Sequence, residues 1–315
     1  MVWKGYDFIP HGTKIDFMRY KGLCLTASLL MMVGSVILAF YPGLTFGIDF
    51  KGGTLIEIGS KTGPADVADI RSKLMTLGLG TPQVQEFGKP EDVLIRIEAQ
   101  PGGEDAQNEV VNKVKQALGD GVEYRRTEVV GPAVSEELRT TGIISVLVSI
   151  LAICAYVWFR FEWQFAAGVV IALLHDVLLT VGMFVITKME FDLSVVAALL
   201  TIVGYSVTDS VVIADRIREN LRKYKKMPMD ALLNQSINET LSRTILTSGS
   251  VIFVLACLVI LGGPVIRAFT LAMLFGIVIG TYSSIFVAAP VLDYFHVKRD
   301  WMARDKAKGQ SKPAV

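Results

Sequence analysis

The chain has 315 residues, of which 52% are hydrophobic and 19% charged, and its formal net charge is +1. A water-soluble protein must cover its core with polar surface. The mean hydropathy of this chain is +0.48, and such a composition excludes a water-soluble protein. The near-zero net charge says nothing about partners, and we expect no nucleic acid among them.

Apolar blocks recur along the chain, each about as long as the roughly 20 residues that cross a bilayer as a helix. We predict six membrane spans, at residues 22–41, 141–159, 165–187, 193–214, 244–262 and 267–292. The first block is too long for a signal peptide and lacks a clear cleavage site, which indicates an uncleaved anchor. The three cysteines lie inside apolar blocks without metal-type spacing, so we expect neither a metal site nor a disulfide framework.

Basic residues gather in three segments that lie on one side of the membrane if there are six spans. These segments are the N-terminal residues 1–21, the loop 215–243 and the C-terminal tail 293–315. The positive-inside rule places all three in the cytoplasm, with both termini inside. The large loop at residues 43–140 is then outside, and it carries more acidic than basic residues.

The outer loop predicts a small folded domain between spans one and two. Alternating segments at 54–58, 82–88, 92–98 and 122–131 predict strands, and residues 64–78 and 103–119 have helical spacing. Lys89-Pro90 is a hairpin signal between the second and third strands. The order β-α-β-β-α-β is that of a ferredoxin-like α+β domain, a fold that does not by itself define a function.

Ionisable residues inside apolar spans are candidates for function because they are costly to bury there. Asp209 lies in span four, and Arg243 lies at the entrance to span five, so the two could approach at similar depth. Tyr205 and Ser206 share a helical face with Asp209. This group predicts a proton site, although a static ion pair between Asp209 and Arg243 would place the same residues there.

Three further polar residues lie in or near the spans. His175 and Asp176, in the middle of span three, are either a second functional cluster or a polar group that orients helices. Asp215 lies near the membrane interface, where we expect it to be solvated.

Span six carries a ridge of small residues that permits close approach of another helix. They recur every four positions as Ala272, Gly276, Gly280, Ser284 and Ala288. Before span five, the segment 228–242 predicts an amphipathic helix along the inner membrane surface or a partner-binding helix.

The segment GIDFKGGTLIEI at residues 47–58 directly follows span one. It lacks the remaining residues of a phosphate loop, and it has too few oxygen ligands for a calcium loop. We interpret it as a hinge between bundle and outer domain, in which Gly47, Gly52 and Gly53 permit turns and Asp49 makes a polar contact. Bulky residues at Gly52 or Gly53 should impair function without preventing membrane insertion.

Five stretches together resemble the SecF proteins of the SecD/SecF protein-export membrane protein family, within the resistance–nodulation–division transporter superfamily. They are GIDFKGGTLIEI, HDV in span three, VGYSVTDSVVIADRIREN, LSRTILTSG and GGPVIRAF. The resemblance covers residues 15–300. It implies a six-helix half of a twelve-span bundle in the bacterial inner membrane, with its ferredoxin-like domain in the periplasm.

The resemblance also implies partners and a role. SecD would supply the other half, and the complex would assist the SecYEG translocon, together with YajC and YidC. It would use protons to promote translocation and release of unfolded preproteins, with Asp209 and Arg243 as proton-linked residues. No cofactor and no catalytic motif is expected. Two alternatives stay open: half of a small-molecule or lipid exporter of this superfamily, and a membrane sensor or scaffold.

Overall fold

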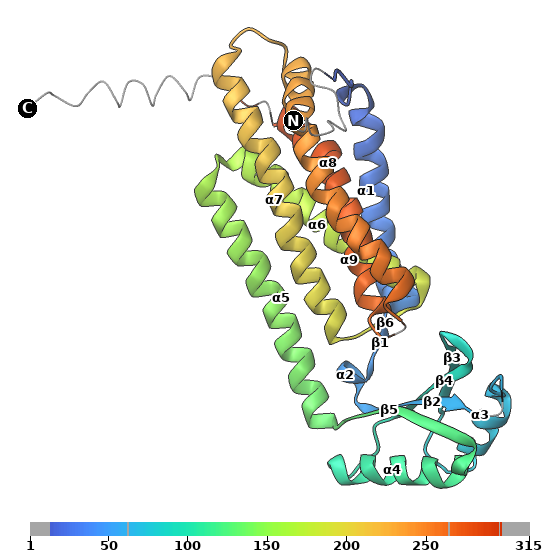
Figure 1. Cartoon of the computed structure of the whole chain (residues 1–315). Helices are drawn as coiled ribbons and strands as arrows, with labels where there is room; N and C mark the ends of the chain where they lie inside the picture. The colour runs from blue at the N-terminus through green and yellow to red at the C-terminus, as the bar shows by residue number, and fades with distance from the viewer. Residues whose placement is uncertain (1–12, 62, 264, 296, 298–315) are drawn as a thin grey trace, which may run out of the picture.

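A computed structural model describes residues 13–61, 63–263, 265–295 and 297 of the chain. A bundle of long helices carries a smaller domain of sheet and helices at one end (Figure 1). The basic residues at the chain ends that entered the orientation argument, Lys4 and those from Lys298 onward, lie outside the described residues.

Within the described residues, six helices are long and apolar enough to cross a membrane, which confirms the predicted number. They are α1 (Lys21–Leu38), α5 (Pro132–Arg160), α6 (Trp163–Thr187), α7 (Leu193–Lys223), α8 (Met229–Leu261) and α9 (Arg267–Ser283). One π-helical turn, Ala39–Gly43, extends α1, and another, Ser284–Ala288, joins α9 to α10 (Ala289–Tyr294).

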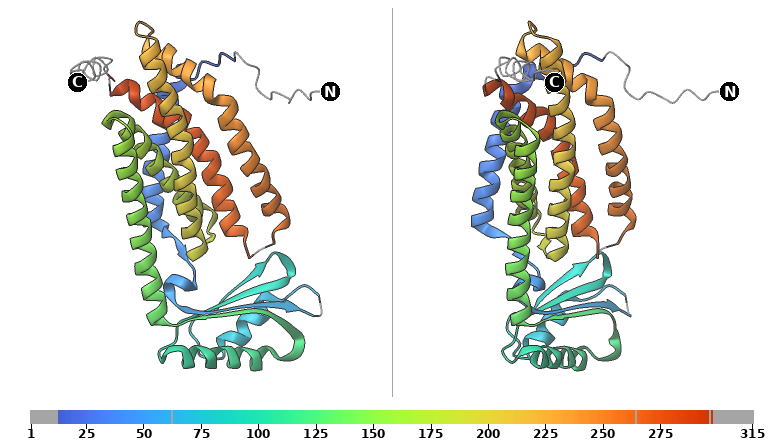
Figure 2. Two further views of the ribbon diagram at one scale, coloured as in Figure 1. Left: turned by 60° about the vertical axis from the view of Figure 1, so that its left-hand side comes forward. Right: turned by 90° about the vertical axis from the view of Figure 1, so that its left-hand side faces the viewer.

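The six helices are not equally enclosed. In α6, α7 and α9, 56% of the most apolar stretch is buried within the chain, against 11% in α1 and α5 and 17% in α8. The first three therefore form the centre of the bundle, and the other three stand at its periphery (Figure 2). A peripheral helix with so little protein around it needs lipid or a partner to cover its apolar side chains.

The predicted amphipathic helix at 228–242 is not a separate surface helix, because it is the first half of α8. Its apolar residues Leu232, Leu233 and Ile237 are fully buried in the core that contains Ile217 and Leu221 of α7. The amphipathic pattern was read correctly, but the apolar side packs on α7 instead of on lipid. No helix-breaking residue separates it from the span that follows.

The outer domain has the predicted order of strands and helices. Its elements are β2 (Gly53–Ser60), α3 (Val67–Met75), β3 (Gln83–Phe87), β4 (Lys89–Glu98), α4 (Gly103–Leu118) and β5 (Val122–Val130). The sheet order is β3-β4-β2-β5 with antiparallel neighbours, and apolar side chains of α3 and α4 pack on one face. This is the split βαβ arrangement, which confirms the ferredoxin-like fold.

Two boundaries differ from the prediction. Lys89-Pro90 lies inside β4, and the turn is at Gly88, whose φ of +87° is readily adopted only by glycine. Helix α5 begins at Pro132, nine residues before the predicted start of span two, because its first turns are polar and hydropathy does not mark them.

Candidate functional site

Asp209 lies in the middle of α7 and is almost completely buried. Its Oδ2 accepts a hydrogen bond of 3.0 Å from the hydroxyl of Ser248 on α8. The Tyr205 hydroxyl donates to Ser248 at 3.3 Å, and Thr281 Oγ1 of α9 lies 2.9 Å from the same serine oxygen. Asp209 is thus bound into a hydroxyl cluster where three helices meet.

Of the residues expected beside Asp209, Tyr205 belongs to its cluster, and Ser206 and Arg243 do not contact it. Ser206 turns to the other side of α7 and donates to Asp176. Among the described residues, no ion pair within 4 Å joins Arg243 to Asp209, whose hydrogen-bond partner is Ser248. The static Asp209–Arg243 pair is therefore absent from this structure.

Sequence reasoning missed Ser248. On the same helix Arg243, Thr247 and Ser250 are exposed, whereas Ser248 is buried. The sequence offered only a serine within a membrane span, and hydropathy does not distinguish Ser248 from Ser250 two residues later.

A second polar cluster surrounds His175 and Asp176, which are 0% and 1% exposed. Asp176 Oδ1 lies 2.9 Å from His175 Nδ1, and its Oδ2 accepts from the hydroxyls of Ser206 and Ser283. The carboxylate therefore has three partners. Within the described residues, His175 Nε2 has no hydrogen-bond partner.

The two clusters share helices α7 and α9. Tyr205 and Ser206 are adjacent on α7, and one belongs to each cluster. On α9, Thr281 contacts the Asp209 cluster and Ser283 the Asp176 cluster. A small rotation of α7 or α9 would therefore alter the hydrogen bonds of both carboxylates at once.

The small-residue ridge of span six packs inside this chain. Ala272 and Ser284 are fully buried. A methyl group at Gly276 would lie 2.4 Å from Ile202 of α7, and one at Gly280 would lie 3.3 Å from Ser206 Cβ. The ridge therefore lets α9 approach α7 and the Asp176 cluster.

The segment at 47–53 joins the bundle to the sheet domain through backbone contacts. Strand β1 (Thr45–Phe46) pairs in parallel with β6 (Glu190–Phe191), which connects α6 to α7. The short helix α2 (Ile48–Lys51) follows, and Asp49 Oδ2 accepts a bond of 2.9 Å from Leu193 N, the first residue of α7. The expected polar contact of Asp49 is thus made to the bundle.

Gly52 and Gly53 are required by backbone conformation and by space. Their φ angles are +72° and +131°. A methyl group at Gly52 would lie 3.2 Å from Ala99 Cβ, and one at Gly53 would lie 2.4 Å from the carbonyl oxygen of Ile97. Nearby, Arg96 of β4 forms an ion pair with Glu190 of β6, and burial lowers the pKa of Arg96. The segment is a closely packed joint, and its role as a hinge stays a prediction.

The architecture defines a multi-pass membrane protein with a folded domain inserted between its first two membrane spans. Residues 110–298 match the family described as protein export membrane protein SecD/SecF, C-terminal, and residues 40–63 match the SecD/SecF GG motif. The chain belongs to the SecD/SecF protein-export membrane protein family, and it is a multi-pass inner-membrane protein. The resemblance seen in the sequence is thereby confirmed.

Full-length relatives are protein translocase SecF subunits. The one from Rhodobacter capsulatus is 45% identical over 94% of this chain and 93% of its own length. The one from Magnetococcus marinus is 48% identical over 89% of this chain and 91% of its own length.

Longer relatives contain a region like this chain as one part. A protein translocase subunit SecDF from Brucella abortus is 43% identical over 92% of this chain, which spans 38% of that protein. The crystal structure of SecDF, a translocon-associated membrane protein from Thermus thermophilus, matches 91% of this chain with a TM-score of 0.82 and 34% identity. The chain spans 39% of that structure.

Proposed function

We propose that this chain supplies the SecF half of a SecD/SecF unit that uses the proton-motive force to promote preprotein translocation and release. SecD is its direct partner, and the SecYEG translocon, with YajC and YidC, is the machinery that it assists. Unfolded preprotein on the periplasmic side is its cargo. Full-length similarity to SecF subunits and partial coverage of SecDF chains support this proposal.

The observation that carries the proposal is the exposed position of Arg243 in α8. It lies 18 residues before Leu261, the end of the helix, or about 27 Å at 1.5 Å per residue. Hydrocarbon is about 30 Å thick, so this guanidinium lies at the border of the membrane core. The Arg243 carbonyl accepts a hydrogen bond from Thr247, but within the described residues the guanidinium makes no hydrogen bond or ion pair.

An unpaired arginine costs roughly 2.5–3.5 kcal/mol or more at the centre of the bilayer, and less at its border. Exposed polar side chains also occur on the two helices, at Thr247 and Ser250 of α8 and at Thr201 and Thr208 of α7. Such a surface is stable in a membrane when another protein covers it. A second six-helix half, as supplied by SecD, would provide the cover and place a partner for Arg243 at the same depth.

Asp209 is the proton-carrying group in this proposal. Within the described residues, its carboxylate has one hydrogen-bond partner, Ser248, whereas the Asp176 carboxylate has three. A buried carboxylate with one donor is poorly compensated as an anion, so proton uptake relieves the cost of burying its charge. Each elementary charge that crosses the membrane supplies roughly 2.3 kcal/mol per 100 mV.

The proposed topology follows the charge distribution of the sequence. Residues 1–21, the loop 215–243 and residues 293–315 are cytoplasmic, and the domain at 43–140 is periplasmic. Residues 22–41 form the first span, and residues 141–292 hold spans two to six. The periplasm supplies no ATP, which leaves the proton gradient as the energy source.

The test is Asp209→Asn in membrane vesicles that carry the complex with SecD. We expect loss of proton-dependent preprotein release with unchanged co-purification of SecD. Asp105→Asn, the same change at an exposed carboxylate of α4, is the control and should keep release. Normal release in the Asp209→Asn variant would refute the proposal and favour a scaffold, whereas unaffected export with lost drug or lipid efflux would favour an exporter.

A further inference from the structure

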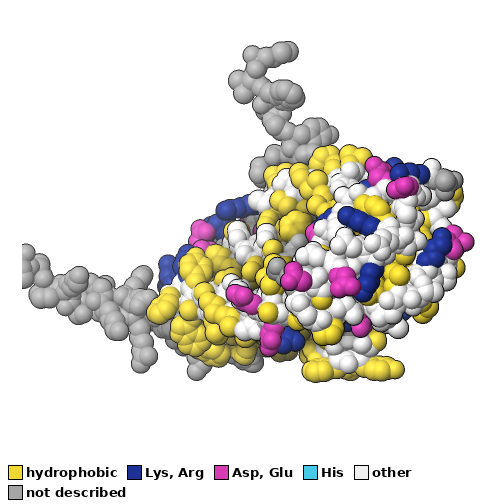
Figure 3. Space-filling model, turned by 90° about the horizontal axis from the view of Figure 1, so that it is seen from below, with side chains coloured by type: hydrophobic (Ala, Val, Ile, Leu, Met, Phe, Trp, Pro, Cys, Tyr) yellow, Lys and Arg dark blue, Asp and Glu magenta, His cyan; other side chains and the backbone are white. Residues whose placement is uncertain are grey.

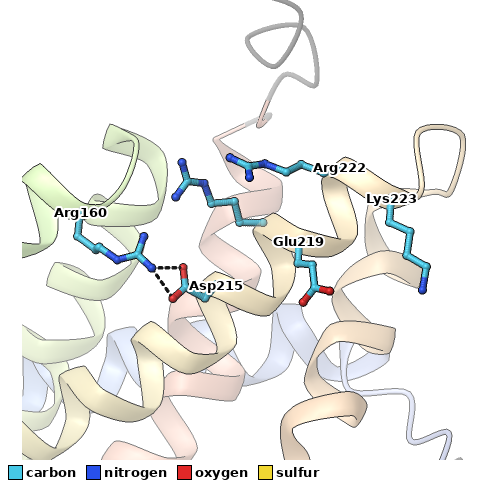
Figure 4. A pocket seen from close by; sticks show the side chains of 6 residues that line it. Arg160, Asp215, Glu219, Arg222 and Lys223 are labelled. Atoms are coloured by element: carbon cyan, nitrogen blue, oxygen red, sulfur yellow. Dashed lines mark hydrogen bonds and ion pairs between the residues drawn. The ribbon is translucent and has the colours of Figure 1, made fainter. Parts of the chain in front are cut away.

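A third polar site, separate from the Asp209 and Asp176 clusters, lies at the end of the bundle opposite the sheet domain, where α5 turns into α6 beside α7. Six side chains line a pocket of about 460 Å³ there. They are Arg160, Asp215, Arg218, Glu219, Arg222 and Lys223. Figure 4 shows Arg160 reaching from the end of α5 to Asp215 of α7, with Arg222 above them and with Glu219 and Lys223 on the side of α7 away from Arg160.

The spacing of α7 builds one wall of the pocket. Asp215, Arg218 and Arg222 are separated by three and four residues, so they share one face of the helix. Arg160 closes the base, because its Nη2 donates to both Asp215 carboxylate oxygens at 2.8 and 2.7 Å. The sequence suggested that Asp215 is simply solvated. In the structure its carboxylate forms an ion pair with Arg160.

Positive charge exceeds negative charge in this pocket. Four of the lining side chains are cationic and two are acidic. Two of the lining charges are paired from outside the lining, Glu219 with Arg216 and Arg218 with Glu162. Arg222 is exposed and forms no ion pair within the described residues, and Arg160 uses only one of its nitrogens on Asp215. Guanidinium donors therefore remain available to a phosphate.

Aromatic side chains place this pocket at the membrane surface. Trp158, Phe159 and Trp163 are exposed around the α5–α6 turn, as in the aromatic belts that mark the interface of a bilayer. Helix α7 continues beyond the end of α5 (Figure 1). From the pocket toward the middle of the membrane, α5 exposes apolar residues such as Leu147 and Leu151, along which acyl chains could lie.

We propose that this pocket binds the phosphate of an anionic phospholipid headgroup. The phosphate would bridge Arg160 of α5 and Arg222 of α7, in addition to the Arg160–Asp215 ion pair that already joins the two helices at this end. Helix α5 is 11% buried within the chain and follows β5 of the sheet domain directly, through Gly131. A bound lipid would therefore fix the helix that carries the outer domain.

The experiment measures thermal unfolding of the full chain in detergent with added phosphatidylglycerol or phosphatidylcholine. Phosphatidylglycerol should raise the Tm, and phosphatidylcholine should not. Arg222→Gln should weaken the response to phosphatidylglycerol about fivefold, the expected effect of one basic residue near an anionic surface. Lys226→Gln, an exposed cation outside the pocket, is the matched control and should respond as the unmodified chain does.

Arg160→Lys is a second variant, which keeps the charge but loses the bidentate geometry, and it should also weaken the response. Equal effects of Arg222→Gln and Lys226→Gln would show a diffuse surface charge and overturn the proposal. An equal Tm shift with inorganic phosphate would identify a soluble anion as the ligand and overturn the lipid assignment. A Tm shift with phosphatidylcholine of the same size would do so as well.

Discussion

Replacement of Gly53 by alanine tests whether the joint between bundle and sheet domain depends on close packing. Gly53 begins β2 and pairs with Glu98 on one side and with Val130 on the other. Its φ is +131°, and an added methyl group would lie 2.4 Å from the Ile97 carbonyl oxygen. Because that oxygen belongs to the backbone of the neighbouring strand, it cannot move away without disturbing the sheet.

The structure gives the size of the effect from two terms. A non-glycine residue in a glycine-only backbone region costs roughly 1–3 kcal/mol, and a methyl group forced into a filled site costs roughly 1–3 kcal/mol more. We therefore expect a loss of about 2–6 kcal/mol from the free energy of unfolding of the sheet domain. A domain has only about 5–15 kcal/mol in total, so the variant should be visibly unstable.

Gly63→Ala is the matched control because Gly63 also has a positive φ outside the left-handed helical region, +114°, but no atom within 4 Å of the added methyl group. It carries the conformational cost alone. Both full-length variants are unfolded by denaturant in detergent, and proteolysis of the sheet domain reports how much of it is unfolded. The measurement gives the difference between their free energies of unfolding. We expect Gly53→Ala to be less stable by about 1–3 kcal/mol, the steric term. Equal stabilities would refute the packing argument.

Two further substitutions in the bundle and one at the joint have defined outcomes. Gly276→Ala should lower the free energy of unfolding by about 1–3 kcal/mol, because the added methyl group would meet Ile202. Gly204→Ala should not lower it, because no atom lies near the added methyl group there. Asp176→Ala should cost more than Asp176→Asn in the same unfolding assay, because only asparagine keeps an acceptor for the two serine hydroxyls. Asp49→Ala should speed hydrogen exchange of the first amide of α7, and an unchanged rate would contradict the contact seen here.

The spans and the domain fold were predictable because each depends on local pattern. A run of about 20 apolar residues indicates a membrane helix whatever it packs against, and alternation of apolar and polar residues indicates a strand whatever it pairs with. Asp209 was predictable for a similar reason, since a charge in an apolar span stands out without knowledge of its neighbours. The partner of Asp209 was not predictable. Whether Ser248 or Ser250 faces α7 depends on the rotation of α8, which is set by tertiary packing.

The same limit explains the mistaken surface helix. The apolar side of residues 228–242 indicates that something covers it, but not whether that is lipid or α7. Leu232 and Ile237 are covered by the neighbouring helix α7, which extends beyond the other spans together with α8. A pattern therefore predicts that a face is buried more reliably than it predicts what buries it.

Helix α7 connects the two functional features that the sequence suggested separately. Its first residue, Leu193, donates to Asp49 of the joint, and Asp209 lies 16 residues further along, about 24 Å away at 1.5 Å per residue. The joint also pairs with β6, immediately before α7. A shift or rotation of α7 on protonation of Asp209 would therefore act directly on the base of the sheet domain. In this arrangement the close packing of Gly52 and Gly53 is an advantage, because a loose joint would absorb the movement that a packed one transmits.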